Sequence, residues 1–521
     1  MKRCRCGRAA TWLVPLALLA VCPPYVAAQT GPQGTPAAPL PAPREFPGEP
    51  VDFTSIIRLA ATNNLDIAHA RAVAEQARAA RQRAIARGLP DLTLGSTYLN
   101  HQGRIQQTNG NILNINRDSL FVGGGPTLNL PISDALFEPL VARQLESAAN
   151  AGFQRVTNDT LLSVGETYLQ MMRARRALAR VDDTLEFLTS EKPSDMRGKS
   201  KGLLPLLRDS VEAGGKEALQ SDLARVQVEV IRRQEERRAI EQDLRVVSAE
   251  LARLVRLDPK VRLWPVDDFR TPISLPGDDL SALDLETLVA MALNSRPELG
   301  ENQALVRATV GRVREARNRP FLPTVNVDLA YGGFGGGPVR DTSRVVDDPF
   351  NGPIAAPITP SNEIHRFGPR TDFGISAVWR LNGLGFGNRA EVREQEAMRD
   401  QAQIRLTQMY ERVAAQVTQA YESVRLTQDR VRVSHSALFD DQGAPTGPAF
   451  RSIRLNFERV RGTEGRPFEV LDSIRGFSDI LDVYGQAVTE HELAKLRLLI
   501  ALGLPAQAYL QTAGTPPPPP R

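Results

Sequence analysis

One long segment of the sequence occurs twice. Residues 284–331 repeat the pattern of residues 52–99, and Asp66 of the first copy corresponds to Glu298 of the second. Each copy reads as a long polar helix followed by a strand of alternating residues. A repeat of this length predicts a duplicated architecture, because solenoids are built from shorter units.

Both copies change from helix to strand at a Leu-Pro pair. Pro90 and Pro323 fit this change, since proline cannot continue a helix interior and biases the preceding residue towards extended backbone. After Pro323 the alternation predicts an apolar face with Val325, Val327, Leu329 and Tyr331, and a polar face with Thr324, Asn326 and Asp328.

The repeat divides the mature chain into two interleaved halves of one body. Composition agrees: of 521 residues, 42% are apolar, only 6% are aromatic and 24% are charged, which favours long helices with narrow apolar stripes. The expected boundaries are a signal peptide at 1–28, a Pro-rich tether at 29–50, a first repeat at 51–258, a connector at 259–283, a second repeat at 284–505 and a disordered Pro-rich tail at 506–521.

The N-terminus has the features of a secretory signal. Basic residues precede an apolar run at 9–21, which is too short to span a membrane, and Val26-Ala27-Ala28 offers a small-residue cleavage site. Cleavage there leaves a mature chain without cysteine. The run 19–22 also resembles a lipobox, which would make Cys22 a lipid anchor; simple cleavage is favoured, because Val21 is unusual before a modified cysteine.

Helices and strands recur in the same order in both halves. Helix patterns cover about 54–87, 134–188, 216–257, 388–435 and 467–502, and strand patterns cover 91–100, 120–130, 324–331 and 373–381. Residues 102–118 and 332–369 are expected to be loops. Polar interruptions at 189–210 and 439–448 break the long helices. Acids and bases alternate along these helices, so their charged faces are expected to be solvated, and the net charge of +4 does not indicate nucleic acid.

The four strands are about as long as a tilted bilayer crossing, roughly ten residues. A sheet in lipid cannot keep free edges, because its unpaired amides have no water to bond. Four strands are too few to close a membrane barrel, so several copies must pool their strands. Two copies would give a barrel filled with side chains, and three would leave room for a pore.

This arrangement resembles the TolC family of outer-membrane channels over nearly the whole mature chain. The resemblance rests on the paired helix starts at 60–67 and 292–299, the Leu-Pro strand entries, the helices of Tyr168 and Tyr421, and the closing Leu-Gly-Leu-Pro at 502–505. It implies an α+β membrane protein in the outer membrane, extending into the periplasm: a homotrimer whose chains close a 12-stranded β-barrel above a long coiled-coil helical barrel. The implied role is the passive exit duct of a tripartite efflux pump or a type I secretion system, with a periplasmic adaptor (membrane fusion protein), an inner-membrane pump and outer-membrane lipid as partners.

The resemblance also points to a periplasmic entrance. In the family a glycine turn precedes an acidic residue on the next helix; here Gly215 precedes Asp222, and Gly462 precedes Glu469. The expected gate residues are Asp222, Glu469, Asp472 and Arg466, and the expected adaptor-contacting tips are Gly215, Gly462 and Thr463. Three copies of the carboxylates would attract cations. Alternatively, these acids simply favour the first turns of their helices.

No catalytic or cofactor-binding pattern is present in the sequence. The five histidines are scattered, the glycines at 332–337 lack the helix start and lysine of a phosphate loop, and no nucleophile and base form a recognisable set. We expect neither an enzyme nor a bound cofactor or metal. The alternative function is a soluble periplasmic coiled-coil scaffold or adaptor without a membrane barrel.

Overall fold

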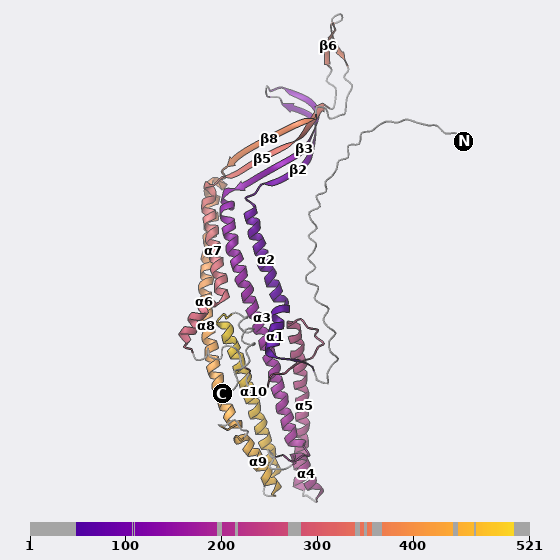
Figure 1. Cartoon of the computed structure of the whole chain (residues 1–521), viewed down its shortest axis with the longest axis vertical. Coiled ribbons are helices and arrows are strands. Elements are labelled where there is room, and N and C mark those ends of the chain that lie inside the picture. Colours follow the sequence, from indigo (N-terminus) through magenta and orange to yellow (C-terminus); the bar gives the residue numbers. More distant parts are fainter. Residues whose placement is uncertain are drawn as a thin grey trace, which may run out of the picture. The chain divides into compact units, whose positions relative to one another are not determined.

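The computed structural model describes residues 48–106, 108, 110–194, 201–213, 217–268, 273, 283–338, 344–348, 352–356, 367–440, 446–462 and 465–504 (Figure 1). Contacts divide the chain into two units, 1–47 and 48–521, and every described residue belongs to the second. The predicted signal peptide, Cys22 and the predicted tail lie outside the described residues.

The two halves of the chain contain long helices and strands in the same order. The first half comprises β1 (Glu49–Val51), α1 (Phe53–Asn63), α2 (Leu65–Ala86), β2 (Asp91–Gln106), β3 (Ile112–Pro131), α3 (Ile132–Thr189), α4 (Leu203–Glu212), α5 (Glu217–Leu254) and β4 (Leu263–Pro265). The second comprises α6 (Leu285–Ser295), α7 (Pro297–Asn318), β5 (Thr324–Pro338), β6 (Arg344–Asp348), β7 (Gly352–Ala356), β8 (Gly368–Val378), α8 (Phe386–Leu438), α9 (Pro448–Arg461) and α10 (Pro467–Ala501), with short 3-10 turns at Arg319–Phe321 and Asn382–Gly385.

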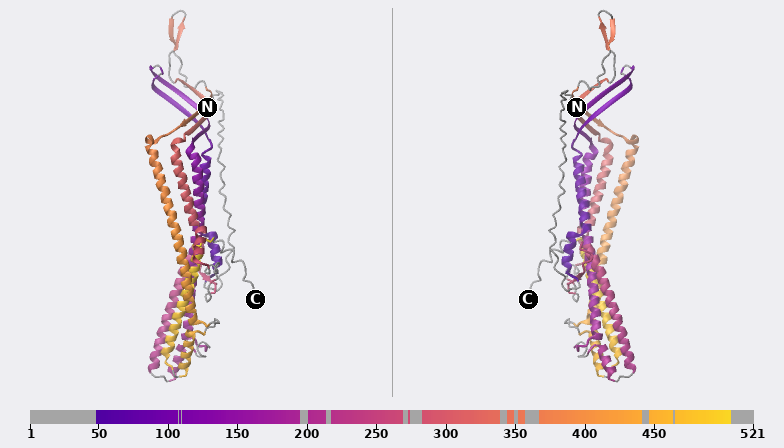
Figure 2. Two further views of the ribbon diagram at one scale, coloured as in Figure 1. Left: turned by 90° about the vertical axis from the view of Figure 1, so that its left-hand side faces the viewer. Right: turned by 90° about the vertical axis from the view of Figure 1, so that its right-hand side faces the viewer.

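Four strands form one antiparallel sheet in the order β2-β3-β5-β8. The helices that lead into and out of these strands pack in the matching order α2-α3-α7-α8, and further from the sheet the order is α5-α3-α10-α8 (Figures 1 and 2). The sheet therefore lies at one end of the helical body, and the C-terminal ends of α4 and α9 lie at the other end (Figure 1). Separately, β1 pairs with β4 and β6 pairs with β7.

The helix predicted at 54–87 is in fact two helices. Asn64 has extended backbone (φ −65°, ψ 134°), its side-chain oxygen accepts from the amides of Asp66 and Ile67, and its amide group donates to the carbonyl of Leu254 at 2.7 Å. This cap satisfies the first amides of α2, so the chain can start a new helix at a new angle. Arg296, which has φ −66° and ψ 123°, separates α6 from α7 at the matching place.

Two predicted loops and one predicted interruption are partly wrong. Within 102–118, β2 continues to Gln106 and β3 begins at Ile112; within 332–369, β5 continues to Pro338 and β6 and β7 form a hairpin. These stretches are polar or glycine-rich, but the antiparallel ladder satisfies their backbone whatever their side chains are. The predicted break at 189–210 contains α4, whose Leu203, Pro205 and Leu207 are buried.

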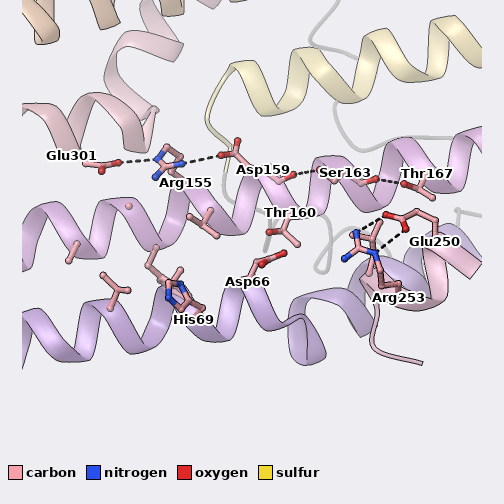
Figure 3. Close-up of a pocket in the computed structure, with 17 residues that line it drawn as sticks. Asp66, His69, Arg155, Asp159, Thr160, Ser163, Thr167, Glu250, Arg253 and Glu301 are labelled. Atoms are coloured by element: carbon pink, nitrogen blue, oxygen red, sulfur yellow. Dashed lines mark hydrogen bonds and ion pairs between the residues drawn. The ribbon is translucent and has the colours of Figure 1, made fainter. Parts of the chain in front are cut away.

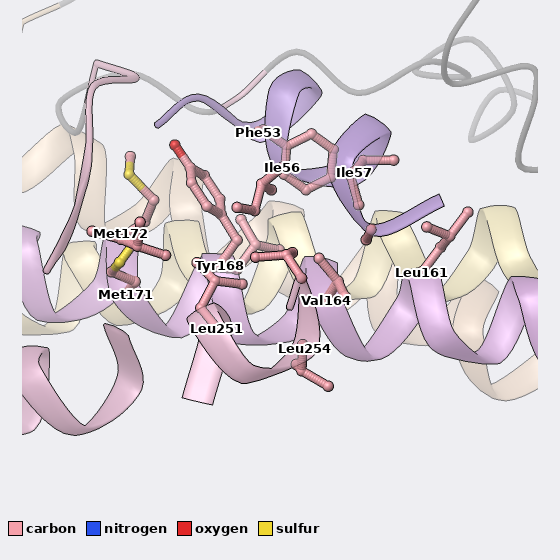
Figure 4. Close-up of a cluster of buried hydrophobic side chains, with 14 of the residues drawn as sticks. Phe53, Ile56, Ile57, Leu161, Val164, Tyr168, Met171, Met172, Leu251 and Leu254 are labelled. Atoms are coloured by element: carbon pink, nitrogen blue, oxygen red, sulfur yellow. The ribbon is translucent and has the colours of Figure 1, made fainter. Parts of the chain in front are cut away.

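The largest core cluster lies where α1, α3 and α5 meet (Figure 4). Phe53 packs edge to face on Tyr168, with the ring centroids 5.7 Å apart. The Tyr168 hydroxyl lies 2.6 Å from the carboxylate of Asp267, which also accepts from the amide of Phe53. Burial, reinforced by this hydrogen bond, raises the pKa of Tyr168 far above its ordinary value.

None of the helices in the described part of the chain is both long enough and apolar enough to cross a membrane.

Candidate functional site

The end of the helical body furthest from the sheet consists of two helical hairpins. One is formed by α4 and α5, and the other by α9 and α10; both pack around a common apolar cluster that includes Leu207, Phe457 and Phe477. Phe477 is central to it, since its ring contacts Phe187 at 5.5 Å and Phe450 at 4.6 Å. These apolar contacts hold the two hairpins together at this end, called the tip below, and fix where Asp222, Glu469 and Asp472 lie.

Asp222 lies on the second turn of α5, and its side chain is 19% exposed. Its carboxylate pairs with Arg225 of the same helix at 3.4 Å. Gly215, which the sequence placed at the turn before it, lies outside the described residues. Asp222 is therefore close to the tip, but its charge is partly balanced within its own helix.

The other predicted gate residues surround the start of α10. Arg466 is its exposed N-cap residue, Glu469 stands in its first turn and pairs with Arg459 of α9 at 3.0 Å, and Asp472 is exposed and has no ion pair with any described residue. Gly462 ends α9, whereas Thr463 lies outside the described residues. The structure brings Glu469 and Asp472 onto neighbouring turns of one helix and joins neither of them to Asp222.

A buried network of charges that the sequence did not predict lies next to the predicted gate residues, further from the tip. Glu229 of α5 is 2% exposed, accepts from Arg233 at 2.9 Å, and accepts from Arg475 of α10 at 2.7 Å. Burial pushes the pKa of Glu229 upward, but the hydrogen bonds and charges of Arg475 and Arg233 outweigh it and lower the pKa. This carboxylate is thus ionised and joins the two hairpins.

The network continues away from the tip through α3. Arg180 donates to Glu236 of α5 at 2.5 Å and to Ser478 of α10 at 2.9 Å, and Ser478 also accepts from Arg233 at 3.3 Å. Burial raises the pKa of Glu236, but its bonds to Arg180 and Arg233 lower it more. One serine hydroxyl therefore accepts from arginines of two different helices.

A separate buried ion pair lies one turn further along α3, at Arg176. Arg176 donates both terminal nitrogens to Glu492 of α10 at 2.8 and 2.9 Å, and Glu492, 1% exposed, also accepts from the amide of Ile273. The prediction that charged faces are solvated is wrong for these residues. Their spacing of three or four residues along each helix was visible, but it does not distinguish a buried network from an exposed stripe.

A groove of about 730 Å³ lies between α2, α3, α5 and α7 (Figure 3). Arg155 of α3 lies between Glu301 of α7 and Asp159, and Asp66 and His69 line the groove from α2, on the other side of α3 (Figure 3). Opposite charges are paired within the groove, and the described residues contain no cluster that could hold a metal ion.

The sheet has two different faces. The register pairs Leu94 with Gly124, Val327 with Leu128 and Ile375 with Val327, so that one side, the apolar face, carries the large aliphatic and aromatic residues. Its members are Leu92, Leu94, Tyr98, Leu120, Val122, Leu128, Leu130, Val325, Val327, Leu329, Tyr331, Phe373, Ile375 and Ala377. The opposite, polar face carries mostly short polar residues and glycines: Asp91, Thr93, Thr97, Thr127, Asn129, Asn326, Asp328, Asp372 and Ser376, with Gly95, Gly123, Gly125, Gly332 and Gly374. The same face also carries the apolar residues Leu99, Phe121, Ala330, Phe334 and Val378, and Arg370.

Neither a protein-family model nor a curated protein sequence matches this chain. Several solved structures are similar to it. The outer-membrane channel OprN has a TM-score of 0.62 and 17% identity, and the match covers 87% of this chain and 90% of OprN. A membrane protein from Pseudomonas aeruginosa has a TM-score of 0.65 and 16% identity, with 88% of this chain and 91% of that chain covered, and the outer membrane protein VceC from Vibrio cholerae has a TM-score of 0.63 and 15% identity, with 87% and 96% covered. The predicted fold class, long helices joined to four long antiparallel strands, is confirmed. The chain therefore has the fold of the outer-membrane channels, and the resemblance to the TolC family is confirmed at the level of that fold.

Proposed function

We propose that this chain is a trimeric outer-membrane channel, the passive exit duct of a tripartite efflux pump or a type I secretion system. The fold shared with outer-membrane channels supports a transport role. In this proposal the shape and charge of the pore govern which cargo passes, and an inner-membrane pump supplies the energy. No chemical step on the cargo is required of this chain.

The observation that carries the proposal is the four-stranded sheet with an apolar and a polar face. Its outer strands, β2 and β8, each pair with a single neighbour among the described strands, so each has one free edge. Lipid would leave those edge amides without partners, and pairing β2 of one copy with β8 of the next removes both free edges. Three copies supply twelve strands, with the apolar face towards lipid and the polar face towards the pore.

The helices support the same symmetry. α2 lies at one side of the helical layer next to the sheet, with Val73 and Ile85 exposed, and α8 lies at the other side, with Ile404 exposed. One rotation that joins β8 to β2 also brings α8 to α2. In a closed ring these apolar side chains are buried between copies.

The tip completes the proposal. Asp222, Glu469 and Asp472 would ring the periplasmic entrance in three copies, with Arg466 beside them, and the turns at Gly215, Gly462 and Thr463 would meet the periplasmic adaptor. Supporting this are the positions of Glu469 in the first turn of α10 and of Asp222 and Asp472 in the second turns of α5 and α10, near the starts of these helices. Carboxylates from three copies facing one axis would attract cations and repel anions.

Cell fractionation tests the proposal. We expect the full chain to sediment with outer membranes, the detergent-solubilised protein to have the mass of a trimer by light scattering, and the trimer to conduct ions across a planar bilayer. A water-soluble periplasmic monomer or dimer would contradict the proposal and favour the coiled-coil scaffold instead.

A further inference from the structure

A band of large side chains crosses the polar face of the sheet, with one residue from each strand. We name Leu99 (β2), Phe121 (β3), Phe334 (β5) and Arg370 (β8) the belt. Phe121 and Phe334 are direct cross-strand partners, Leu99 is diagonal to Phe121, and Arg370 is diagonal to Phe334. Directly opposite and diagonal neighbours on one face are within reach of aromatic and long side chains, so the belt is a continuous surface.

The belt differs from the rest of its face. Around the two phenylalanines the same face carries glycine at 123, 332 and 336, and closer to the helices it carries Asn326 and Ser376, which hydrogen-bond to each other at 3.3 Å. Large rings surrounded by glycines stand out from the sheet surface. If the polar face lines a pore, the pore is narrowed at this level.

No described helix packs on the belt to explain its rings as core residues (Figure 1). Leu99 is 63% exposed, and Phe121 and Phe334 are only partly buried, against one another and the neighbouring strands. A large apolar side chain left open on an otherwise polar face is a feature that calls for a partner. These side chains therefore do not fill a core between the sheet and a described helix.

The belt also carries a cation. The guanidinium of Arg370 lies 4.9 Å from the centre of the Phe334 ring and pairs with Asp372 at 2.8 Å. Arg117, on the same face and four residues before Phe121, is exposed and has no ion pair with any described residue. The belt and its surroundings on that side therefore combine ring faces with a net positive charge, which suits a flat, negatively charged aromatic solute.

We propose that the belt is a contact site for planar aromatic organic anions on their way through the channel. The proposal rests on the proposed function, because it needs three copies around a common axis. In that trimer the belt becomes a ring of six phenylalanines, three leucines and three arginines. Rings of the cargo stack on Phe121 and Phe334, and its anionic groups are attracted by Arg370 and Arg117.

Single-channel recording of the full-length trimer in a planar bilayer tests this. The two probes are naphthalene-1,5-disulfonate, which is planar and aromatic, and propane-1,3-disulfonate, which carries the same charge on an aliphatic chain. We expect the aromatic probe to reduce the wild-type current at a concentration at which the aliphatic probe does not. In the double variant Phe121→Leu with Phe334→Leu, which keeps apolar bulk but removes the ring faces, we expect the half-blocking concentration of the aromatic probe to rise about tenfold.

Phe373→Leu on the apolar face of β8 is the matched control and should keep the wild-type block. If the wild-type trimer conducts but both probes block it equally, the proposed role of the belt is wrong, while the proposed channel function stands. The same conclusion follows if the double variant has the wild-type half-blocking concentration for the aromatic probe. A chain that forms no conducting trimer overturns the proposed function, and the belt with it. The unblocked current of each variant shows in the same experiment whether it has folded and inserted.

Discussion

Glu229 of α5 and Arg475 of α10 form an ion pair with two hydrogen bonds, of 2.7 and 3.1 Å, between the two hairpins of the tip. The carboxylate is almost fully buried, whereas the Arg475 side chain is 39% exposed. The other oxygen of Glu229 accepts from Arg233, which is itself buried. The pair is therefore asymmetric: losing the carboxylate takes a charged partner from two arginines, one of which, Arg233, is buried and keeps only Glu236, whereas losing Arg475 leaves Glu229 still paired with Arg233.

This asymmetry predicts unequal effects of two neutral substitutions. Glu229→Gln should lower the free energy of unfolding by about 3 kcal/mol, because it removes a buried carboxylate shared by Arg233 and Arg475 and leaves the buried Arg233 with Glu236 as its remaining carboxylate partner. Arg475→Gln should cost about 1 kcal/mol, because the arginine is half in solvent and Glu229 keeps Arg233. Denaturant unfolding of the solubilised protein, followed by circular dichroism, measures both; equal losses would show that the carboxylate is not the centre of the network.

The same network predicts a dependence of stability on pH. The pKa values of Glu229 and Glu236 are lowered in the folded protein, so the unfolded chain binds protons more readily than the folded one. The stabilisation is then complete above the ordinary glutamate pKa of about 4.3 and is lost as the pH falls through the lower folded values. The thermal midpoint should fall between pH 6 and pH 3 in the wild type and fall less in Glu236→Gln, since that variant has one fewer such group. A Glu236→Gln protein with the full wild-type slope would contradict this.

The gate acids should contribute unequally to ion selectivity. Asp222 and Glu469 are paired with Arg225 and Arg459, but Asp472 is exposed and has no ion pair with any described residue. Asp472→Asn should therefore reduce cation selectivity more than Asp222→Asn does, because an unpaired charge acts on the pore at full strength. The reversal potential in a salt gradient measures this, and an exposed acid away from the tip, Asp429→Asn on α8, serves as the control. Equal shifts in all three variants would remove Asp472 from the gate.

The sequence predicted the parts of this fold that depend on local chemistry. Pro90 and Pro323 mark helix-to-strand changes, and the apolar alternation after Pro323 correctly predicted which residues of β5 share one face of the sheet. The burial of Arg176 and Glu492 could not be predicted in this way, because their pairing joins α3 to α10 over 316 positions of sequence. A charged residue on a helix has the same local pattern whether it faces water or a partner helix.

The polar ends of β2 and β3 were missed for a related reason. Asn100 pairs with Asp118 in the ladder, and polar residues occur on both faces there, so no alternation identifies a strand. Pairing between two chain segments, and not periodicity within either one, determines the structure at that point. The positions of the gate acids within an assembled entrance depend in the same way on contacts between copies, which stay a prediction.

Tyr168 should stabilise the junction between the connector and the long helix α3. Its hydroxyl contacts Asp267, which also accepts from Phe53 at the start of α1. Tyr168→Phe keeps the ring contact and removes only the hydroxyl, so we expect a loss of about 2 kcal/mol for one hydrogen bond to a charged group. Hydrogen exchange at the amide of Phe53 should become faster, and unchanged exchange would show that this bond does not hold the junction. Tyr421→Phe, at the corresponding place in α8, is the control.

Two glycines should respond to alanine with opposite signs. A Cβ on Gly447, the N-cap residue of α9, would lie 2.5 Å from the carbonyl carbon of Leu438 and 2.7 Å from the oxygen of Ala437, both of which are backbone atoms of α8. The amide of Gly447 donates to the carbonyl of Leu438, so neither segment can move away without losing that bond. Gly447→Ala should therefore lower the thermal midpoint.

Gly476 lies inside α10 with no atom near its Cβ position, and Gly476→Ala should stabilise the protein by roughly 0.5–1 kcal/mol, because alanine restricts the unfolded chain and favours helix. Melting curves of the two variants measure both effects, and a stabilising Gly447→Ala would mean that α8 and α9 are not joined as closely as this contact requires.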